Sequence, residues 1–284
     1  MDIGITTAFS HHTPVEQIIG TAQRIEAAGF STVWVPEHVL FFPEYASDYP
    51  YAEDGRVPGD PDGVLDPFSA LTFIAAHTTT LRLATGICLV PQRQPVYTAR
   101  LVADLDYLSG GRVDLGVGVG WLAEEFDALG VDFSARGRLC DEYIGVMRAM
   151  WGPDPVTHRG DTVRIDNAQA NPKPVQAPVP VYIGGESGPA LRRVARLGDG
   201  WYGFNLTPEG LAEKLERLDP LLADAGRTRA ELSIAVSPGR NRVEPEHVAA
   251  YAAAGADQVV VGLFGRNLDE IDRRLDRLRP LLDA

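Results

Sequence analysis

The amino-acid sequence predicts an α/β protein folded as a (β/α)8 TIM barrel, with a single domain over residues 1–284. Strand-like apolar runs alternate with helix-like amphipathic segments eight times along the chain. Eight parallel strands joined by crossover helices close into a barrel. The length of 284 residues also suits this fold, because such barrels occupy about 250 residues plus insertions.

The first half of the chain supplies four of the eight strand–helix units. Gly29 and the Gly110-Gly111 pair end two of the helices, and Asp66-Pro67 caps the start of another. The predicted strands are Ile3–Phe9, the apolar start of Thr32–His38, Leu81–Val90 and Arg112–Gly120. The predicted helices are Val15–Ala28, Asp66–His77, Pro95–Leu108, and the pair Leu122–Leu129 and Arg136–Trp151.

The second half continues the alternation with four shorter strands. These are Val181–Gly185, Gly200–Phe204, Leu232–Val236 and Gln258–Phe264, and the helices that follow them are Ala190–Leu197, Pro208–Ala225, Pro245–Ala254 and Leu268–Leu282.

Two insertions interrupt the alternation. Residues 39–66, after strand 2, contain four prolines and many aromatic and acidic residues, which predicts a lid-like loop or pocket wall. Residues 152–180, between helix 4 and strand 5, contain a predicted hairpin, VTHRGDTVRI, and then the proline-rich stretch NPKPVQAPVP. We interpret this second insertion as an excursion from the barrel.

Composition excludes several classes of partner. The formal net charge of -13 would repel nucleic acid and anionic membranes. No run of 18 or more apolar residues and no signal peptide is visible, so neither membrane insertion nor secretion is expected. Cys88 and Cys140 lie in apolar patterns and are interpreted as reduced core thiols, which suits the cytoplasm. No set of His, Cys and carboxylate residues has metal-ligand spacing.

The second predicted strand ends in a carboxylate beside an imidazole, Glu37-His38. An isolated pair of this kind can simply cap a strand and face solvent. In a barrel, however, the carboxyl ends of the strands form the mouth where ligands bind. The barrel prediction therefore favours Glu37 and His38 as functional residues.

Two glycine runs also follow predicted strands. GVGVG at Gly116–Gly120 lacks the spacing of a dinucleotide fingerprint, but alternate glycines would let a strand pass close to something bulky in the barrel mouth. GGESG at Gly184–Gly188 lies between a strand and a helix, where free amides and a helix amino terminus can hold a phosphate. A plain turn would need fewer glycines.

Six motifs together resemble a known family. They are VWVPEH, TGICLVPQRQP, LDYLSGGRVDLGVGVGW, the RG…DEY helix, PKPVQAPVPVYIGG and RLGDGWY. The combination is similar to the luciferase-like monooxygenase superfamily, and within it to the actinobacterial oxidoreductases that use the deazaflavin coenzyme F420. The resemblance runs from the first strand to about Phe204, and the final quarter agrees in pattern only.

The resemblance implies a site at the barrel mouth. Glu37 and His38 would face the deazaflavin ring, Gly86-Ile87 would form a cis peptide behind it, and strand four would pass the ring or ribityl chain. The loop from Gly184 to Gly188 would hold the coenzyme phosphate. The residues placed at the coenzyme are Glu37, His38, Thr85, Gly86, Ile87, Gly118, Gly120, Gly184, Gly185, Glu186, Ser187 and Gly188.

The expected reaction is hydride transfer between F420 and a partly apolar organic substrate. His38 would polarise or protonate an oxygen and Glu37 would orient it. The sugar-phosphate dehydrogenases of the family carry a tryptophan and a glutamate where this chain has Phe42 and Trp121, so glucose 6-phosphate is not expected. Glu124 or Glu125 could replace the missing acid if the following helix starts close to the ring.

Two alternatives stay open. An FMN-dependent monooxygenase of the same fold would use the same acid–histidine pair and phosphate loop. A barrel that binds phosphate or flavin without redox chemistry would need only the loop. Basic residues at the mouth, Arg93, Arg240 or Arg242, would favour F420, because its oligoglutamate tail is anionic. The resemblance also implies a homodimer.

Overall fold

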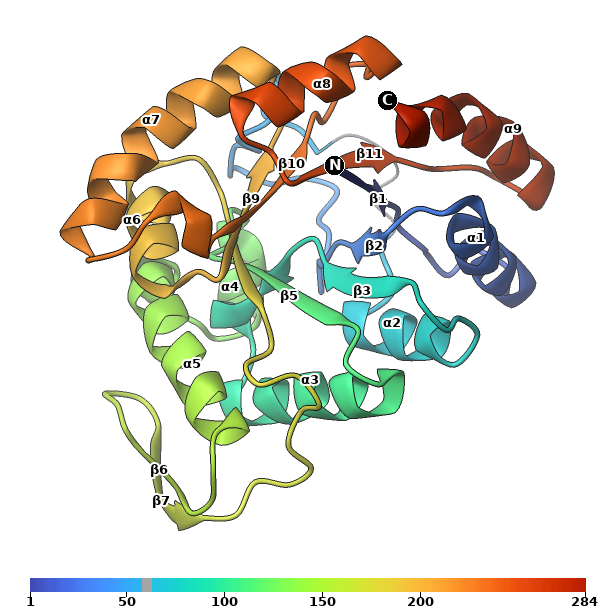
Figure 1. Cartoon of the computed structure of the whole chain (residues 1–284). Helices are drawn as coiled ribbons and strands as arrows, with labels where there is room; N and C mark the ends of the chain where they lie inside the picture. Colours follow the sequence, from blue (N-terminus) through green and yellow to red (C-terminus); the bar gives the residue numbers. More distant parts are fainter. Residues whose placement is uncertain (58–62) are drawn as a thin grey trace.

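The computed structural model describes residues 1–57 and 63–284. Within them, eight parallel strands pair in a closed ring with helices around it, which confirms the predicted (β/α)8 barrel (Figure 1). The barrel strands are β1 (Asp2–Thr6), β2 (Thr32–Val35), β3 (Arg82–Thr85), β5 (Val113–Gly118), β8 (Val181–Gly184), β9 (Gly200–Phe204), β10 (Ser233–Ser237) and β11 (Gln258–Gly262).

The helices follow the strands in the predicted order. They are α1 (Val15–Ala28), α2 (Pro67–Ala75), α3 (Pro95–Ser109), α4 (Ala123–Ala128), α5 (Arg136–Trp151), α6 (Gly188–Leu197), α7 (Pro208–Asp224), α8 (Pro245–Ala254) and α9 (Leu268–Leu278). Short 3-10 turns lie at Val90–Gln92, Phe133–Ala135, Arg229–Glu231 and Arg279–Asp283. Asp66 caps α2 as predicted, since its carboxylate accepts from the Ser69 N–H at 2.8 Å. In the described part of the chain, no helix could span a membrane.

The third predicted strand, Leu81–Val90, is not continuous, and this prediction was wrong. It is split into β3 and the two-residue strand β4 (Cys88–Leu89), with the predicted cis peptide Gly86-Ile87 between them. The side chain of Ile87 packs against the cluster that fills the barrel interior. Residues 86 and 87 therefore leave the strand ladder, which periodicity in the sequence does not reveal.

Trp34 on β2 organises the interior of the barrel. It clusters with Ala84, Tyr202, Ala235 and Val260, which come from four other strands. Its ring lies 4.6 Å from the Tyr202 ring, and its Nε1–H donates to Gln258 Oε1 at 2.9 Å. This cluster fills the interior of the barrel at the level of Trp34. The residues that follow β2 therefore lie at the carboxyl ends of the strands, which form the mouth of the barrel.

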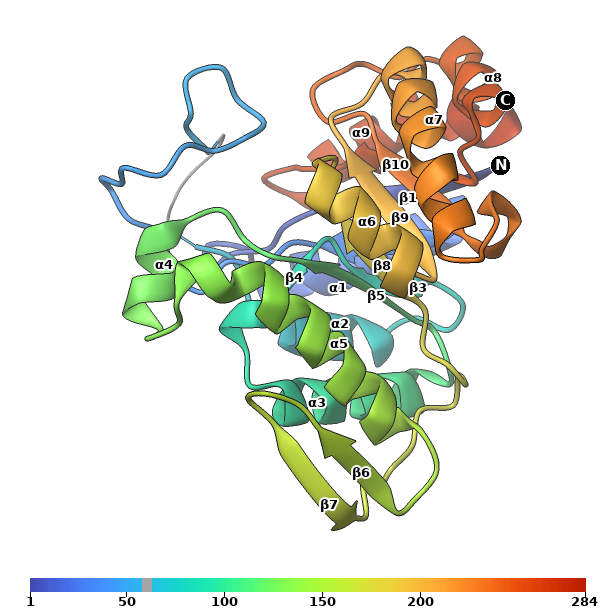
Figure 2. The ribbon, with the colours of Figure 1, turned by 90° about the vertical axis from the view of Figure 1, so that its left-hand side faces the viewer.

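Both predicted insertions are present. Residues 152–180 contain the antiparallel hairpin of β6 (Val156–Arg159) and β7 (Arg164–Ala168), which confirms that prediction. Residues 39–57, the described part of the insertion after β2, contain no helix or strand and lie on the same side of the barrel as α4 (Figure 2). Residues 58–62 of the predicted lid-like loop lie outside the described residues. We name residues 39–57 the β2–α2 segment.

We predict that Gly116→Ala destabilises the fold by about 1–3 kcal/mol through overpacking. A Cβ atom at this position would lie 2.0 Å from the backbone oxygen of Thr85 and 3.1 Å from Trp34 Cζ3, and neither atom can move freely. Urea unfolding followed by circular dichroism measures the change. Gly145→Ala in α5 is the matched control: its Cβ would meet nothing closer than 3.6 Å, and alanine favours a helix. Equal stability of the two variants would contradict the prediction.

Candidate active site

Glu37 lies directly after β2, but its carboxylate turns into the protein. It is 4% exposed and accepts hydrogen bonds from the Leu89 N–H and from Arg93 Nε, both at 2.6 Å. The guanidinium of Arg93 also pairs with Asp66, the cap of α2. Both oxygens of Glu37 are thus bound by the protein's own donors.

His38 takes a different direction from its neighbour. Its Nδ1 lies 3.3 Å from Glu125 Oε2, and its side chain is 15% exposed. The imidazole packs beside Phe41, with ring centroids 4.6 Å apart, and beside Trp121 at 5.9 Å. The structure therefore pairs His38 with Glu125 rather than with Glu37.

Glu125 is completely buried, and its carboxylate binds four groups at the barrel mouth. Besides His38, it accepts from the backbone N–H groups of Val39 at 2.6 Å and Leu40 at 3.0 Å, and from Gln92 Nε2 at 2.9 Å. Burial by itself would raise the pKa of Glu125, but the hydrogen bonds from His38, Leu40 and Gln92 outweigh burial and lower the pKa. An ionised carboxylate only accepts, so we assign the proton to Nδ1 of His38.

The sequence held a partial signal for Glu125. Glu124 and Glu125 follow the glycines of the fourth predicted strand. Whether either carboxylate reaches the barrel mouth depends on where the next helix starts. Helix α4 starts at Ala123, and its first turn presents Glu125 to His38. Glu124 instead accepts from the Ala46 N–H at 2.6 Å and the Ser47 hydroxyl at 2.8 Å, so it holds the β2–α2 segment.

The glycines on β5 and β8 make room for side chains of this chain. A Cβ at Gly118 would lie 2.1 Å from Ile87 Cδ1, and one at Gly184 would lie 2.6 Å from the same atom. A Cβ at Gly120 would lie 2.8 Å from Phe126 Cε2. Gly118 and Gly184 therefore accommodate Ile87, which follows the cis peptide Gly86-Ile87, whereas Gly120 accommodates Phe126. The same region uses Thr85, whose hydroxyl donates to the Gly116 carbonyl at 2.6 Å.

The loop from Gly184 to Gly188 joins β8 to α6, as predicted. Gly185 adopts a left-handed conformation with φ of 101°, and the Ser187 hydroxyl caps α6 by accepting from the Ala190 N–H at 3.3 Å. In the described part of the chain, the backbone N–H groups of Gly185, Ser187 and Gly188 donate to no protein acceptor. These donors lie at a helix amino terminus, which is an arrangement that suits an anion.

The carboxylate of Glu186 does not extend the anion-binding set. It accepts from the Phe204 N–H at 2.7 Å and from the Tyr51 hydroxyl at 2.8 Å. Burial raises the pKa of Glu186, and these two donors partly offset the effect. Glu186 therefore links the loop to the β2–α2 segment.

An aromatic wall encloses the approach to His38. Tyr45 and Tyr49 lie edge-on to Trp121, with centroid distances of 5.6 and 5.2 Å. Tyr51 lies edge-on to Phe204 at 4.8 Å. These rings come from the β2–α2 segment and from the ends of two strands, and they give the mouth a largely apolar lining.

Of the three arginines considered for an anionic tail, two are engaged elsewhere. Arg93 is bound to Glu37 and Asp66, and Arg242 pairs with Glu244. Arg240 is exposed after β10 and acts electrostatically on Tyr49. Among residues 1–57 and 63–284, no group of three or more His, Cys, Asp and Glu side chains is placed to hold a metal ion.

Two known proteins are similar to this chain in sequence. The protein is 32% identical over 265 residues, 92% of each chain, to an uncharacterized protein of Mycobacterium tuberculosis. It is 30% identical over 199 residues to the FMNH(2)-dependent dimethylsulfone monooxygenase of Pseudomonas fluorescens, covering 68% of this chain and 53% of that one.

The fold is shared with an F420-dependent secondary alcohol dehydrogenase solved with an F420-acetone adduct. The TM-score is 0.76 at 19% identity, over 99% of both chains. The sequence model of the luciferase-like monooxygenase family matches residues 1–270. Together with the closed barrel and its mouth, this match shows that the chain belongs to the luciferase-like monooxygenase family of oxidoreductases.

Proposed function

We propose that this protein is an F420-dependent oxidoreductase that transfers a hydride between the deazaflavin coenzyme and a partly apolar organic substrate. The observation that carries the proposal is the presentation of His38 at the barrel mouth by the ionised Glu125. The aromatic wall supports a ring beside His38, and the loop 184–188 supports a phosphate at the amino terminus of α6.

The residues present fit such a coenzyme. The N–H groups of Gly185, Ser187 and Gly188 would hold the phosphate, with the amino terminus of α6 behind them. Thr85, Gly86, Ile87, Gly118 and Gly120 would lie beside the ring or ribityl chain, and Gly184 would begin the phosphate loop, as the family resemblance implies. The coenzyme supplies the hydride chemistry, and the protein supplies position and a dry environment.

His38 is the proposed catalytic acid or base. With Nδ1–H directed at Glu125, its Nε2 can accept a proton from, or once protonated deliver one to, an oxygen of the substrate or of the ring. The aromatic wall of Tyr45, Tyr49 and Trp121 would keep water away from His38 Nε2 during the proton transfer. We assign Glu37 a positioning role, because its bonds to Leu89 and Arg93 fix the chain after β4.

An FMN-dependent monooxygenase is the second candidate. The similarity to the FMNH(2)-dependent monooxygenase of Pseudomonas fluorescens favours it, since the loop 184–188 would serve the phosphate of either coenzyme. Arg240 favours F420, because an exposed cation at the mouth would attract its anionic tail. A barrel without redox chemistry is a weaker candidate, because the chain belongs to the luciferase-like monooxygenase family.

Titration of the purified protein with F420, FMN and FAD tests the proposal. We expect a dissociation constant for F420 at least about tenfold below that for FMN, which is a difference of about 1.4 kcal/mol in binding free energy. Coenzyme fluorescence reports the binding. Tighter binding of FMN would establish the second candidate, and weak binding of all three would favour a barrel without redox chemistry.

We predict that His38→Ala lowers turnover at least about tenfold while coenzyme affinity changes little, because the lost group acts in the chemical step. Single-turnover kinetics with the preferred coenzyme separates the two effects. Glu125→Gln keeps the size of the side chain but removes its charge, so its turnover should fall between those of wild type and His38→Ala. Unchanged turnover in His38→Ala would show that the imidazole is structural.

We also propose a single-domain homodimer in the cytoplasm. The buried thiols of Cys88 and Cys140 are unpaired, which suits a reducing compartment.

The outward face of α3 carries exposed apolar side chains, among them Tyr97 (75% exposed) and Leu108 (67% exposed). Arg100 and Asp104 on this helix neutralise each other in an ion pair of 3.0 Å. In a chain of net charge -13, a largely apolar face whose two charges cancel suits contact with a second copy.

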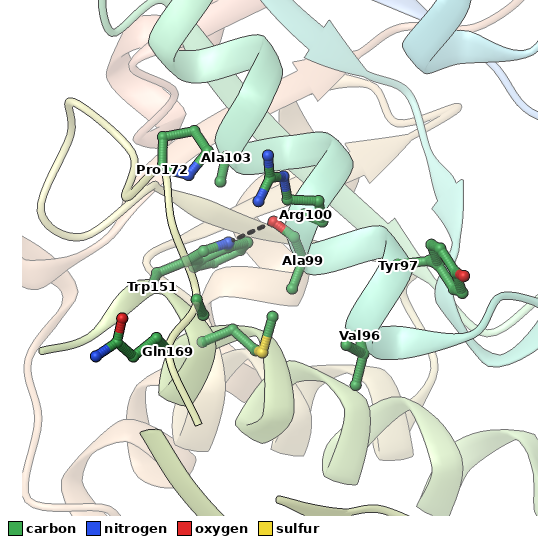
Figure 3. A pocket seen from close by; sticks show the side chains of 10 residues that line it. Val96, Tyr97, Ala99, Arg100, Ala103, Trp151, Gln169 and Pro172 are labelled. Carbon is green, nitrogen blue, oxygen red and sulfur yellow. Dashed lines mark hydrogen bonds between the residues drawn. The ribbon is translucent and has the colours of Figure 1, made fainter. Parts of the chain in front are cut away.

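A cavity of about 220 Å³ beside this helix extends the proposed contact face (Figure 3). It lies between α3, α5 and residues 169–172, on the outside of the barrel and away from the strand ends. Trp151 forms part of its lining and is held by a hydrogen bond of 2.9 Å from its Nε1–H to the Ala99 carbonyl. This mainly apolar cavity, whose lining includes Tyr97, offers a partner helix a place to pack.

We predict that Leu108→Glu converts the dimer to a monomer of 30.8 kDa. The substitution would bury a carboxylate in each copy of a symmetric contact. Sedimentation velocity measures the mass. Leu129→Glu is the matched control, because Leu129 is an exposed leucine next to α4 and should leave the dimer intact. A monomeric wild-type protein, or a dimeric Leu108→Glu variant, would contradict the proposed interface.

A further inference from the structure

The β2–α2 segment is fastened to the barrel by three carboxylates. Glu125 and Glu124, both on α4, accept from the backbone near its start, at Val39, Leu40, Ala46 and Ser47. Within this segment, Glu186, from the loop between β8 and α6, accepts a hydrogen bond from the side chain of Tyr51. The beginning of the segment is thus held through its backbone. Among the described residues, 48–57 make one hydrogen bond to the barrel, through the Tyr51 hydroxyl, beside ring contacts of Tyr49 and Tyr51.

Tyr51 is suited to this single attachment. Its ring packs edge-on to Phe204 at 4.8 Å, and its hydroxyl lies 2.8 Å from Glu186 Oε2. Burial raises the pKa of Tyr51, and the neighbouring carboxylate of Glu186 adds to the effect. The hydroxyl therefore keeps its proton and remains a donor.

Glu186 connects this attachment to the coenzyme loop. Its other oxygen accepts from the Phe204 N–H at 2.7 Å, and its backbone lies between Gly185 and Ser187. A phosphate on the neighbouring N–H groups would displace water from this side of the carboxylate. Tyr51 would then be one of few remaining donors, so the hydrogen bond would gain importance when the loop is occupied.

We propose that the hydrogen bond from Tyr51 to Glu186 is a latch that holds the β2–α2 segment closed over a ligand whose phosphate lies on residues 184–188. Tyr51 is accordingly a positioning residue for retention of the coenzyme. The latch itself follows from the contacts of the chain, whereas its link to a phosphate rests on the proposed function.

Tyr51→Phe removes the hydroxyl and keeps the ring against Phe204. In the ligand-free protein, we expect amide hydrogen exchange in residues 48–57 to rise at least about tenfold, because a hydrogen bond to a charged group is lost. Tyr49→Phe is the matched control: it makes the same change two residues away, where the hydroxyl has no hydrogen-bond partner among the described residues. Mass spectrometry of peptides from this range measures exchange.

The variant Glu186→Gln tests whether the two residues act through their mutual bond. Its exchange should lie between those of wild type and Tyr51→Phe, and the double variant should exchange no faster than Tyr51→Phe alone. Additive effects, or exchange in Tyr51→Phe equal to that in Tyr49→Phe, would overturn the latch.

Coenzyme release supplies the second readout. Stopped-flow fluorescence with F420, and separately with FMN, should show dissociation from Tyr51→Phe about tenfold faster than from wild type, with association within about twofold. A dissociation rate from Tyr51→Phe equal to that from wild type would show that the latch does not retain the coenzyme. If neither coenzyme binds the wild-type protein, the proposed function fails, while the exchange experiment still decides whether the latch exists.

Discussion

The buried carboxylate of Glu125 is the group on which the mouth of the barrel depends. It accepts hydrogen bonds from the imidazole that follows β2, from two backbone amides at the start of the β2–α2 segment and from Gln92 after β4. Removing a partner from a buried charge typically costs about 3–5 kcal/mol, so these donors are strongly held. Because one acceptor serves them all, the direction of His38 and the path of the segment are determined together.

Glu37 and His38 are adjacent after β2 but have different partners: Glu37 binds Arg93, and His38 binds Glu125. Arg93 bridges Glu37 and Asp66, so a single guanidinium ties β2 to the cap of α2. Burial and the nearby Glu37 carboxylate raise the pKa of the Cys88 thiol, which stays neutral beside this network. The network fixes Glu37 to Leu89 and Arg93, while the neighbouring His38 side chain remains partly exposed.

Ile87 links the interior of the barrel to its mouth. Its side chain takes the space that Gly118 and Gly184 leave open, and these glycines belong to the two strands that lead to Trp121 and to the loop 184–188. Larger residues at either position would displace Ile87 and with it the turn between β3 and β4. The site is therefore supported by packing within the barrel as well as by the hydrogen bonds at its rim.

The sequence by itself determined the features that depend on local pattern. Hydrophobic periodicity marked the eight strand–helix units, cap residues marked helix ends such as Asp66, and strand ends placed His38 and the loop 184–188 at the mouth. Only the tertiary structure decided the partner of His38, which lies 87 residues away, the inward turn of Glu37 and the break after Thr85. These depend on which side chains meet once the barrel closes, and no local propensity of the chain encodes such distant contacts.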